Sequence, residues 1–211
     1  MLIKKEKTDT DTRMLLLVTA AKLFGEHGFE AVSTRMLAKA SAVNIAMIAY
    51  YFGSKEKLFE AIIEEYVPKT REVLLDILQQ DVTPWKKFSL AIEVYVDKMF
   101  LNRSVAKMMY RELSLQQRPA HSDRIMDAIM RNWEVMNQII VEGQNKGKFR
   151  KDIDVVMTMA STFGTILQIV NTPCIAARAM REANEIDVFS DENRLRVTTH
   201  LKQMMKAHLV I

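Results

Sequence analysis

The sequence contains only one cysteine among its 211 residues, and it is also poor in glycine and proline. A lone cysteine, Cys174, excludes a disulfide bond within the chain and is typical of a reducing compartment. Six glycines and four prolines leave few residues that interrupt helices. The good helix formers Leu, Met, Ala, Lys and Glu are abundant, and there is no sustained alternation of apolar and polar residues. The composition therefore predicts an all-α protein.

Metal-binding and catalytic patterns are missing as well. The four histidines, at positions 27, 121, 200 and 208, have no cysteine or carboxylate beside them at the spacing that a structural metal needs. Serine, histidine and acidic residues occur, but none forms a nucleophile elbow, a phosphate-binding loop or another local catalytic signature. We therefore expect no metal, no cofactor and no catalytic residue, and we favour a binding protein over an enzyme.

The long apolar segments that export or membrane insertion requires are also lacking. The amino-terminal Met-Leu-Ile is followed at once by charged residues, so it lacks the apolar core of a secretory signal. The uncharged run from Val155 to Ala177 contains several polar residues and Pro173, which favour a buried or intersubunit helix over a membrane span. We expect a cytoplasmic protein without a membrane partner.

The charge of the chain does not identify its partner. The net charge is +4 and the pI is about 9.1, which is compatible with nucleic-acid binding. Residues 1–60 hold nine basic and seven acidic side chains, and nine minus seven gives only +2. A prediction of DNA binding must therefore come from a motif.

Such a motif lies between residues 33 and 58. Ser33 or Thr34 begins a short helix whose apolar residues recur at helical spacing, and residues 41–43 form a turn. Asn44 caps a second short helix, which ends before Gly53, and a third helix starts at Ser54. Two short helices joined by a tight turn predict a helix-turn-helix, whose second helix can enter the major groove of DNA.

The other helices follow from apolar spacing and capping residues. One is predicted from Asp9 or Asp11 to about His27, after a basic arm of residues 1–8 that is either an untethered terminus or a contact to DNA phosphates. Pro68 should kink or interrupt the helix that starts at Ser54. Further helices should begin at Pro84 and about Ser104. The remaining helices should span about residues 121–143, 152–171, 173–183 and 192–209, with an acidic turn at 184–191.

The run from Ala42 to Phe59 resembles the recognition-helix signature of the TetR family of bacterial transcriptional regulators. The matching residues are Val43, Asn44, Tyr50, Phe52, Ser54, Lys55, Glu56 and Leu58. Ala42 stands where the family usually has a turn glycine, and Ala49 where it has Tyr or Asn. If the turn needs a positive φ, the β-carbon of Ala42 costs about 1 kcal/mol or more. The resemblance implies a three-helix helix-turn-helix DNA-binding domain at residues 1–53 and a helical ligand-binding and dimerisation domain at 54–211.

The resemblance also implies a function. It indicates a repressor that binds operator DNA as a homodimer and is released by a small, largely apolar ligand; the alternative is a constitutive DNA-binding protein without an effector. The candidates for base edges are Asn44, Ile45, Ala46 and Met47, although Ile45 could instead face the core. The candidates for phosphates are Thr34, Arg35, Tyr50, Tyr51 and Lys55, of which Tyr50 could equally be half-buried packing. Lys55 is assigned from the family, in which this lysine meets the DNA backbone.

The carboxy-terminal helices supply candidates for two further surfaces. Large apolar side chains and one amide are the candidates for a ligand pocket, although for each of them the core is the favoured alternative: Phe88, Tyr95, Met99, Met109, Trp133, Met136, Met159, Phe163 and Gln168. Ala160 and Gly164 have the small-residue spacing that lets two helices approach closely. TetR-like proteins commonly dimerise through their last two long helices, so the resemblance implies a dimer surface with Ala160, Gly164, Leu167, Leu201 and Met205.

Overall fold

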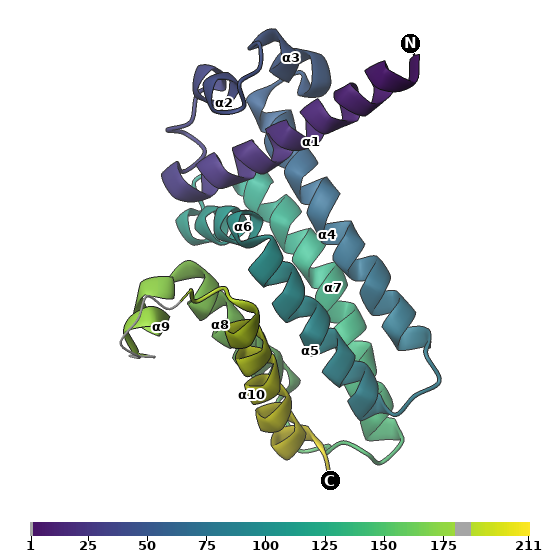
Figure 1. The fold of residues 1–211 in the computed structure, drawn as a ribbon. Helices are drawn as coiled ribbons and strands as arrows, with labels where there is room; N and C mark the ends of the chain where they lie inside the picture. The colour runs from purple at the N-terminus through teal and green to yellow at the C-terminus, as the bar shows by residue number, and fades with distance from the viewer. Residues whose placement is uncertain (1, 180–186) are drawn as a thin grey trace. The chain divides into compact units, whose positions relative to one another are not determined.

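The computed structural model describes residues 2–179 and 187–211, and within these ranges the chain is helical (Figure 1). The helices are α1 (Leu2–His27), α2 (Thr34–Ala40), α3 (Ala46–Phe52), α4 (Lys55–Gln79), α5 (Pro84–Leu101), α6 (Arg103–Leu115), α7 (Pro119–Asn145), α8 (Val155–Asn171), α9 (Pro173–Ala179) and α10 (Asp191–Leu209). The extended pairing found in the described part is an isolated bridge between Phe149 and Val210. The all-α prediction is confirmed.

Several helix boundaries differ from those predicted. Helix α1 begins at Leu2 rather than at Asp9 or Asp11, since residues 2–8 contain no glycine or proline to interrupt it. Helix α8 is capped by Asp154 rather than Asp152, because the Asp154 carboxylate accepts a hydrogen bond from Met157 N at 3.0 Å. Pro68 lies inside α4, which continues to Gln79 without interruption. The expected end of α9 near residue 183 and the first three residues of the expected turn at 184–191 lie outside the described residues.

The chain forms two compact units. The first contains residues 1–68 and 104–128, so α6 and the start of α7 belong to it together with α1, α2 and α3. Its core has a centre of three phenylalanine rings, Phe24, Phe29 and Phe59, whose centroids are 5.2 to 5.9 Å apart. Leu37 on α2 and Ile48 on α3 are buried in the same cluster. The division of the chain by function at residue 53 stays a prediction.

The second unit contains residues 69–103 and 129–211. Helix α5 packs against α8 and α10, and these two helices also contact each other. Phe88 on α5 and Phe149 are fully buried, with ring centroids 6.5 Å apart. The end of the chain is held to this core because Arg150 N donates to Leu209 O at 2.8 Å. Cys174, on α9, is exposed.

Most of the local signals of the helix-turn-helix are confirmed. The Ser33 hydroxyl accepts from Met36 N at 3.2 Å and caps α2. The Asn44 side chain accepts from Ala46 N at 2.9 Å, but Ile45 rather than Asn44 occupies the N-cap position of α3. Gly53 ends α3 with a φ of 79°, and the Ser54 hydroxyl accepts from Lys57 N at 3.1 Å. The turn residue Ala42 has a φ of 52°, so the turn does require the left-handed region at a residue with a β-carbon.

We expect the replacement Ala42→Gly to stabilise the protein. Relief of the left-handed backbone gains about 1 to 2 kcal/mol, and the greater freedom of glycine in the unfolded chain offsets about 0.4 to 1 kcal/mol of this gain. Urea unfolding should therefore show a net gain of about 1 kcal/mol. The matched control is Ala49→Gly, an exposed position within α3, which should lose about 1 kcal/mol. A loss of stability in Ala42→Gly would show that the turn is not strained.

Candidate nucleic-acid interface

Helix α3 presents one buried and one exposed face. Ile48 and Phe52 are 2% and 7% exposed and anchor the helix in the core of the first unit. The candidates for base edges lie at the start of the helix: Asn44, Ile45 and Ala46 are exposed, and Met47 is half-buried. Ile45 is 46% exposed, which favours the surface over the core for this side chain. The start of α3 is therefore available to a groove of DNA.

The candidates for phosphate contacts differ in how accessible they are. Arg35, in the first turn of α2, is exposed, and Thr34 beside it is half-buried. The side chain of Tyr50 is 71% exposed, which argues against the alternative that it packs half-buried in the core. Tyr51 is half-buried, and its hydroxyl donates to the Asp9 carboxylate on α1, which raises the pKa of Tyr51. Tyr51 thus ties α3 to α1.

Lys55 has partners within the chain. Its ammonium group donates to Phe29 O and Val32 O, both at 3.1 Å, and lies 4.2 Å from the centroid of the Phe29 ring. The side chain is half-buried, and it turns toward the connection between α1 and α2. This placement differs from the phosphate contact that the family resemblance implies.

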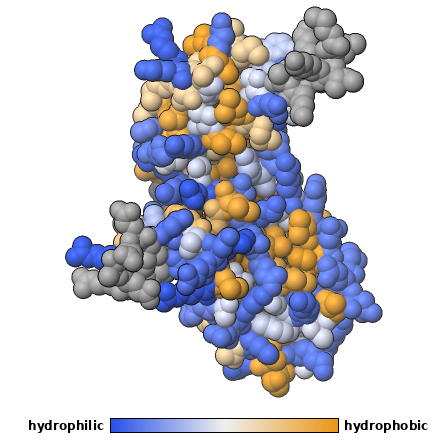
Figure 2. Space-filling model, viewed as in Figure 1, coloured by the Kyte–Doolittle hydropathy of each residue, from blue (hydrophilic) through white to orange (hydrophobic). Residues whose placement is uncertain are grey.

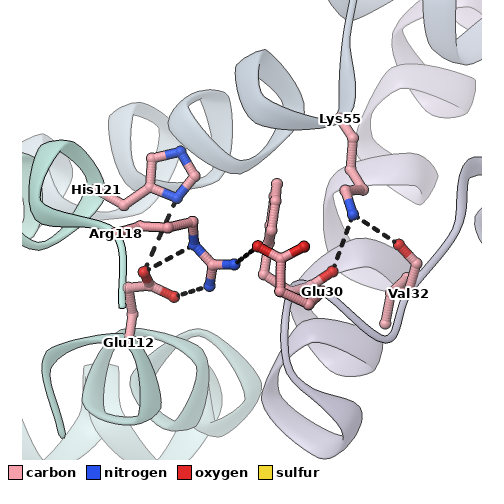
Figure 3. A network of polar contacts seen from close by, with 7 residues as sticks. Glu30, Val32, Lys55, Glu112, Arg118 and His121 are labelled. Atoms are coloured by element: carbon pink, nitrogen blue, oxygen red, sulfur yellow. Dashed lines mark hydrogen bonds and ion pairs between the residues drawn. The ribbon is translucent and has the colours of Figure 1, made fainter. Parts of the chain in front are cut away.

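A second group of charged side chains, centred on Arg118, also contacts the connection between α1 and α2 (Figure 3). Arg118, between α6 and α7, donates through Nε to Glu112 Oε1 at 3.0 Å and through Nη2 to Glu112 Oε2. Its Nη1 donates to Glu30, in the connection between α1 and α2. The side chain of Glu112 is 5% exposed and that of Glu30 is 70% exposed. The buried carboxylate is therefore neutralised by a bidentate arginine that also reaches the surface loop.

His121 completes this group. Its ring stacks on Phe59 at a centroid distance of 4.6 Å and an interplanar angle of 12°, and Nδ1 lies 4.0 Å from Glu112 Oε1. Burial lowers the pKa of His121, while the Glu112 carboxylate acts in the opposite direction. The ring therefore lies between an aromatic side chain and a carboxylate.

Sequence reasoning did not identify Glu30, Glu112, Arg118 or His121. Glu30 and Arg118 are 88 residues apart, and no local pattern predicts that they meet. One signal was present: Glu112 falls in helical register with Val105 and Met108, the apolar face of α6. An acidic residue in that register indicates a buried carboxylate that needs a partner.

Comparison with known families agrees with these features. A model of bacterial regulatory proteins of the tetR family matches residues 16–62, and a model of the C-terminal region of YsiA-like proteins matches residues 59–184. The chain belongs to the TetR family. It is a DNA-binding transcriptional regulator and not an enzyme, as the sequence predicted.

Individual relatives of this TetR-family chain are distant. The probable HTH-type transcriptional regulator YttP of Bacillus subtilis is 26% identical over 64% of this chain, and the alignment spans 65% of YttP. The fatty acid metabolism regulator protein of the same bacterium is 22% identical over 75% of this chain and 81% of its own length.

Solved structures share the fold. The transcriptional regulator FadR from Bacillus subtilis in complex with stearoyl-CoA has a TM-score of 0.65 at 20% identity and covers 89% of this chain and 96% of its own. The ketosteroid transcriptional regulator KstR2 of Mycobacterium tuberculosis has a TM-score of 0.70 at 17% identity, and the alignment covers 94% of this chain and 95% of KstR2.

The candidate ligand residues of the TetR-family body fall into different environments. Phe88, Tyr95, Met136 and Met159 are buried, Met99, Trp133 and Phe163 are half-buried, and Gln168 is exposed. The rings of Tyr95 and Phe163 meet edge to face at 4.5 Å, and burial raises the pKa of Tyr95.

Two of the nine candidates have other partners. Met109 packs against the core of the first unit, whereas the other eight lie in the second. Gln168 donates to Thr172 at 2.8 Å, at the end of its own helix. The seven remaining apolar candidates all lie in the second unit, and their role in binding stays a prediction.

The candidate dimer residues differ in how exposed they are. Ala160 and Gly164 are exposed on α8, with open space around the position of a β-carbon at Gly164, and Leu167 is half-buried. Leu201 and Met205 on α10 are 0% and 2% exposed, and Thr162 donates to the sulfur of Met205 at 3.3 Å. Since these two side chains are already enclosed by their own unit, they have no exposed surface to offer a partner. The exposed residues of α10, such as Leu195 at 67%, take their place as candidates.

Among the described residues, no single helix is long and apolar enough to cross a membrane. Helices α8 and α9, which are bent by 91° at the break between them, reach that length and apolar composition only as a pair. The described residues also contain no group of three or more His, Cys, Asp or Glu that could hold a metal ion.

Proposed function

We propose that this TetR-family regulator is a repressor that binds operator DNA as a homodimer and is released by a small, largely apolar ligand. The observation that carries the proposal is the geometry of α3, whose apolar face is anchored while Asn44, Ile45 and Ala46 are exposed. Such a helix can place amide and methyl groups against base edges. We place the protein in the cytoplasm, where operator DNA is accessible.

We infer that the dimer forms through the exposed faces of α8 and α10. On α8, Met157, Ala160, Ser161 and Gly164 are exposed at helical spacing, and small residues among them permit close packing of two helices. Apolar side chains reach the surface at several places, and Figure 2 shows them in orange on one face of the molecule. In a twofold dimer the two copies of α3 would meet half-sites about 34 to 36 Å apart.

For the ligand, we propose a compound with a long acyl chain. The solved FadR structure is described as a complex with stearoyl-CoA, and a curated relative is a fatty acid metabolism regulator. The buried side chains of the second unit include Met136 and Met159 as well as Phe88 and Tyr95. Methionine adapts its shape to flexible apolar groups, so this environment suits an alkyl chain.

The test is a selection of duplexes from a random library by the wild-type protein, followed by binding measurements with stearoyl-CoA. We expect a palindromic duplex to be enriched, and stearoyl-CoA to weaken its binding by about 5- to 150-fold, which corresponds to a coupling of about 1 to 3 kcal/mol. Free coenzyme A is the control and should have no effect. If the duplex binds equally well with and without a series of acyl compounds, the alternative of a constitutive DNA-binding protein is favoured.

A further inference from the structure

The connection between α1 and α2, residues 28–33, is held by side chains from two separate elements, and a third side chain contacts the end of α1 before it. It leads from the end of α1 to Ser33, the residue that caps α2, so its conformation sets where the helix-turn-helix begins. Phe29 and Val32 are buried, and Glu30 and Ala31 are exposed. Gly28 N and Ser33 O take part in the hydrogen bonds of α1 and α2, and between them Val32 N donates to Phe29 O at 3.3 Å. The residues between the two ends need further contacts to keep one conformation.

Lys55 supplies the first of these contacts, from the start of α4. Its ammonium group donates to Phe29 O, which also accepts from Val32 N at 3.3 Å, and to Val32 O, so both acceptors are backbone carbonyl groups of the connection. The ammonium group also lies over the Phe29 ring, within the range of a cation–π contact. The start of α4 is thereby fixed to the connection.

Arg118 supplies the second contact, from the segment between α6 and α7. Its guanidinium carbon lies 4.3 Å from the centroid of Phe29, and its Nη1 holds Glu30. Arg111 on α6 adds a third cation, since it donates to Glu26 O at 3.3 Å at the end of α1. In Figure 3, Arg118 reaches between Glu112 and Glu30, and Lys55 points at Val32.

We propose that Lys55 and Arg118 are positioning residues for DNA binding, which fix the connection between α1 and α2 and hence the start of the helix-turn-helix without touching DNA. This inference rests on the proposed operator binding. It assigns Lys55 a role different from the phosphate contact that the family resemblance implies. It also makes the segment between α6 and α7 part of what determines DNA affinity.

The experiment compares three variants on a duplex that the wild-type protein selects from a random library. Lys55→Met keeps the aliphatic chain and removes the donors, and Glu30→Ala removes the outer partner of Arg118. Arg118 itself is left in place, because its loss would leave Glu112 buried and unpaired. Arg35→Met, at an exposed candidate for a phosphate contact, is the matched control. Binding is measured against salt concentration at a temperature at which circular dichroism shows each variant to be fully helical.

A positioning role and a phosphate contact predict different results. We expect Lys55→Met to weaken binding on the order of 10-fold with an unchanged slope of log K against log salt, whereas Arg35→Met should reduce the slope by about 0.9. Glu30→Ala should weaken binding by roughly 3-fold, although the loss of an acidic charge near DNA would by itself strengthen it.

Four outcomes would contradict the proposal, and they are distinguishable. A slope reduced by about 0.9 in Lys55→Met would make Lys55 a phosphate contact. Tighter binding by Glu30→Ala would show that Arg118 and Glu30 do not position the motif. Unchanged affinity in both variants would leave only a structural role. If the wild-type protein enriches no duplex, the proposed operator binding fails, and the positioning role fails with it.

Discussion

The replacement Gly143→Ala is expected to destabilise the second unit by about 3 kcal/mol or more, since a β-carbon there would overpack the core. A β-carbon built on Gly143 would lie 2.2 Å from Phe149 Cδ2 and 2.6 Å from Cε2 and Cγ of the same ring. Phe149 is 0% exposed, and Phe88 packs edge to face against it. The ring has no room to withdraw. Either the helix α7 or the turn that follows it must shift.

The turn itself resists such a shift. Gly143 O accepts hydrogen bonds from Lys148 N at 2.9 Å and Phe149 N at 3.1 Å, which close the end of α7. Movement of Phe149 would also disturb its pairing with Val210 at the end of the chain. Urea unfolding followed by circular dichroism measures the loss.

Gly164→Ala is the matched control for this prediction. Gly164 lies within α8, on its exposed face, and apart from its chain neighbours and the backbone of α8 no atom lies within 4 Å of the added β-carbon. The greater helix propensity of alanine should stabilise α8 by about 1 kcal/mol. Since Gly164 lies on the proposed dimer face, unfolding is measured at several protein concentrations. Similar stability of the two alanine variants would show that Phe149 can move at little cost.

The second large effect is expected from Glu142→Gln, which should destabilise the second unit by about 3 kcal/mol. The side chain of Lys87 is 8% exposed, and its ammonium group donates to Glu142 Oε2 at 2.9 Å, to Glu142 Oε1 at 3.2 Å and to Leu78 O at 2.7 Å. Glutamine retains the shape of the side chain but not its charge. In the variant the ammonium group of Lys87 stays buried, but one of its three acceptor oxygens is replaced by an amide nitrogen. The ammonium group also loses its negatively charged partner, and a buried charge without a counter-ion is costly.

The control for this variant is Lys146→Ala. Lys146 also donates to Glu142 Oε1, at 2.6 Å, but its side chain is 57% exposed. An exposed ion pair of this kind contributes less than about 1 kcal/mol, so Lys146→Ala should unfold nearly as the wild type does. Equal losses in the two variants would contradict a special role for the buried lysine.

The same pair predicts a dependence on pH. Hydrogen bonds from Lys146 and Lys87 hold the pKa of Glu142 below its ordinary value of 4.5. The folded chain therefore binds this proton less readily than the unfolded chain, so the stabilisation is complete above about pH 4.5 and is lost as the pH falls through the folded pKa. Glu142→Gln should lack this part of the acid dependence.

Features determined by neighbouring residues could be predicted from the sequence. Ser33 caps α2, Thr83 caps α5 and Gly53 ends α3 because each acts on backbone groups within about four residues. Resemblance to a family added the function of the motif. The positive φ of Ala42 was raised only as a condition through that resemblance, because the family usually has a glycine at this position of the turn.

Contacts between distant residues could not be predicted in this way. Lys55 reaches carbonyl groups 23 and 26 residues earlier, and Arg118 reaches a carboxylate 88 residues earlier. Helical spacing identifies Leu201 and Met205 as members of an apolar face, but it does not distinguish the core of one chain from a surface shared by two. Only the packing of α10 on α5 and α8 determines that their side chains are enclosed.

The single exposed cysteine provides a natural site for attaching a spectroscopic label, so no cysteine has to be introduced by mutation. Cys174 is the only thiol in the sequence, and it lies on the surface of α9. A nitroxide spin label reacts with exposed thiols, so each chain would carry one label at a known position. In a homodimer, pulsed electron paramagnetic resonance would then report one interlabel distance. A change in that distance on addition of an acyl compound would reveal rearrangement of the dimer in solution, even before the operator sequence is known.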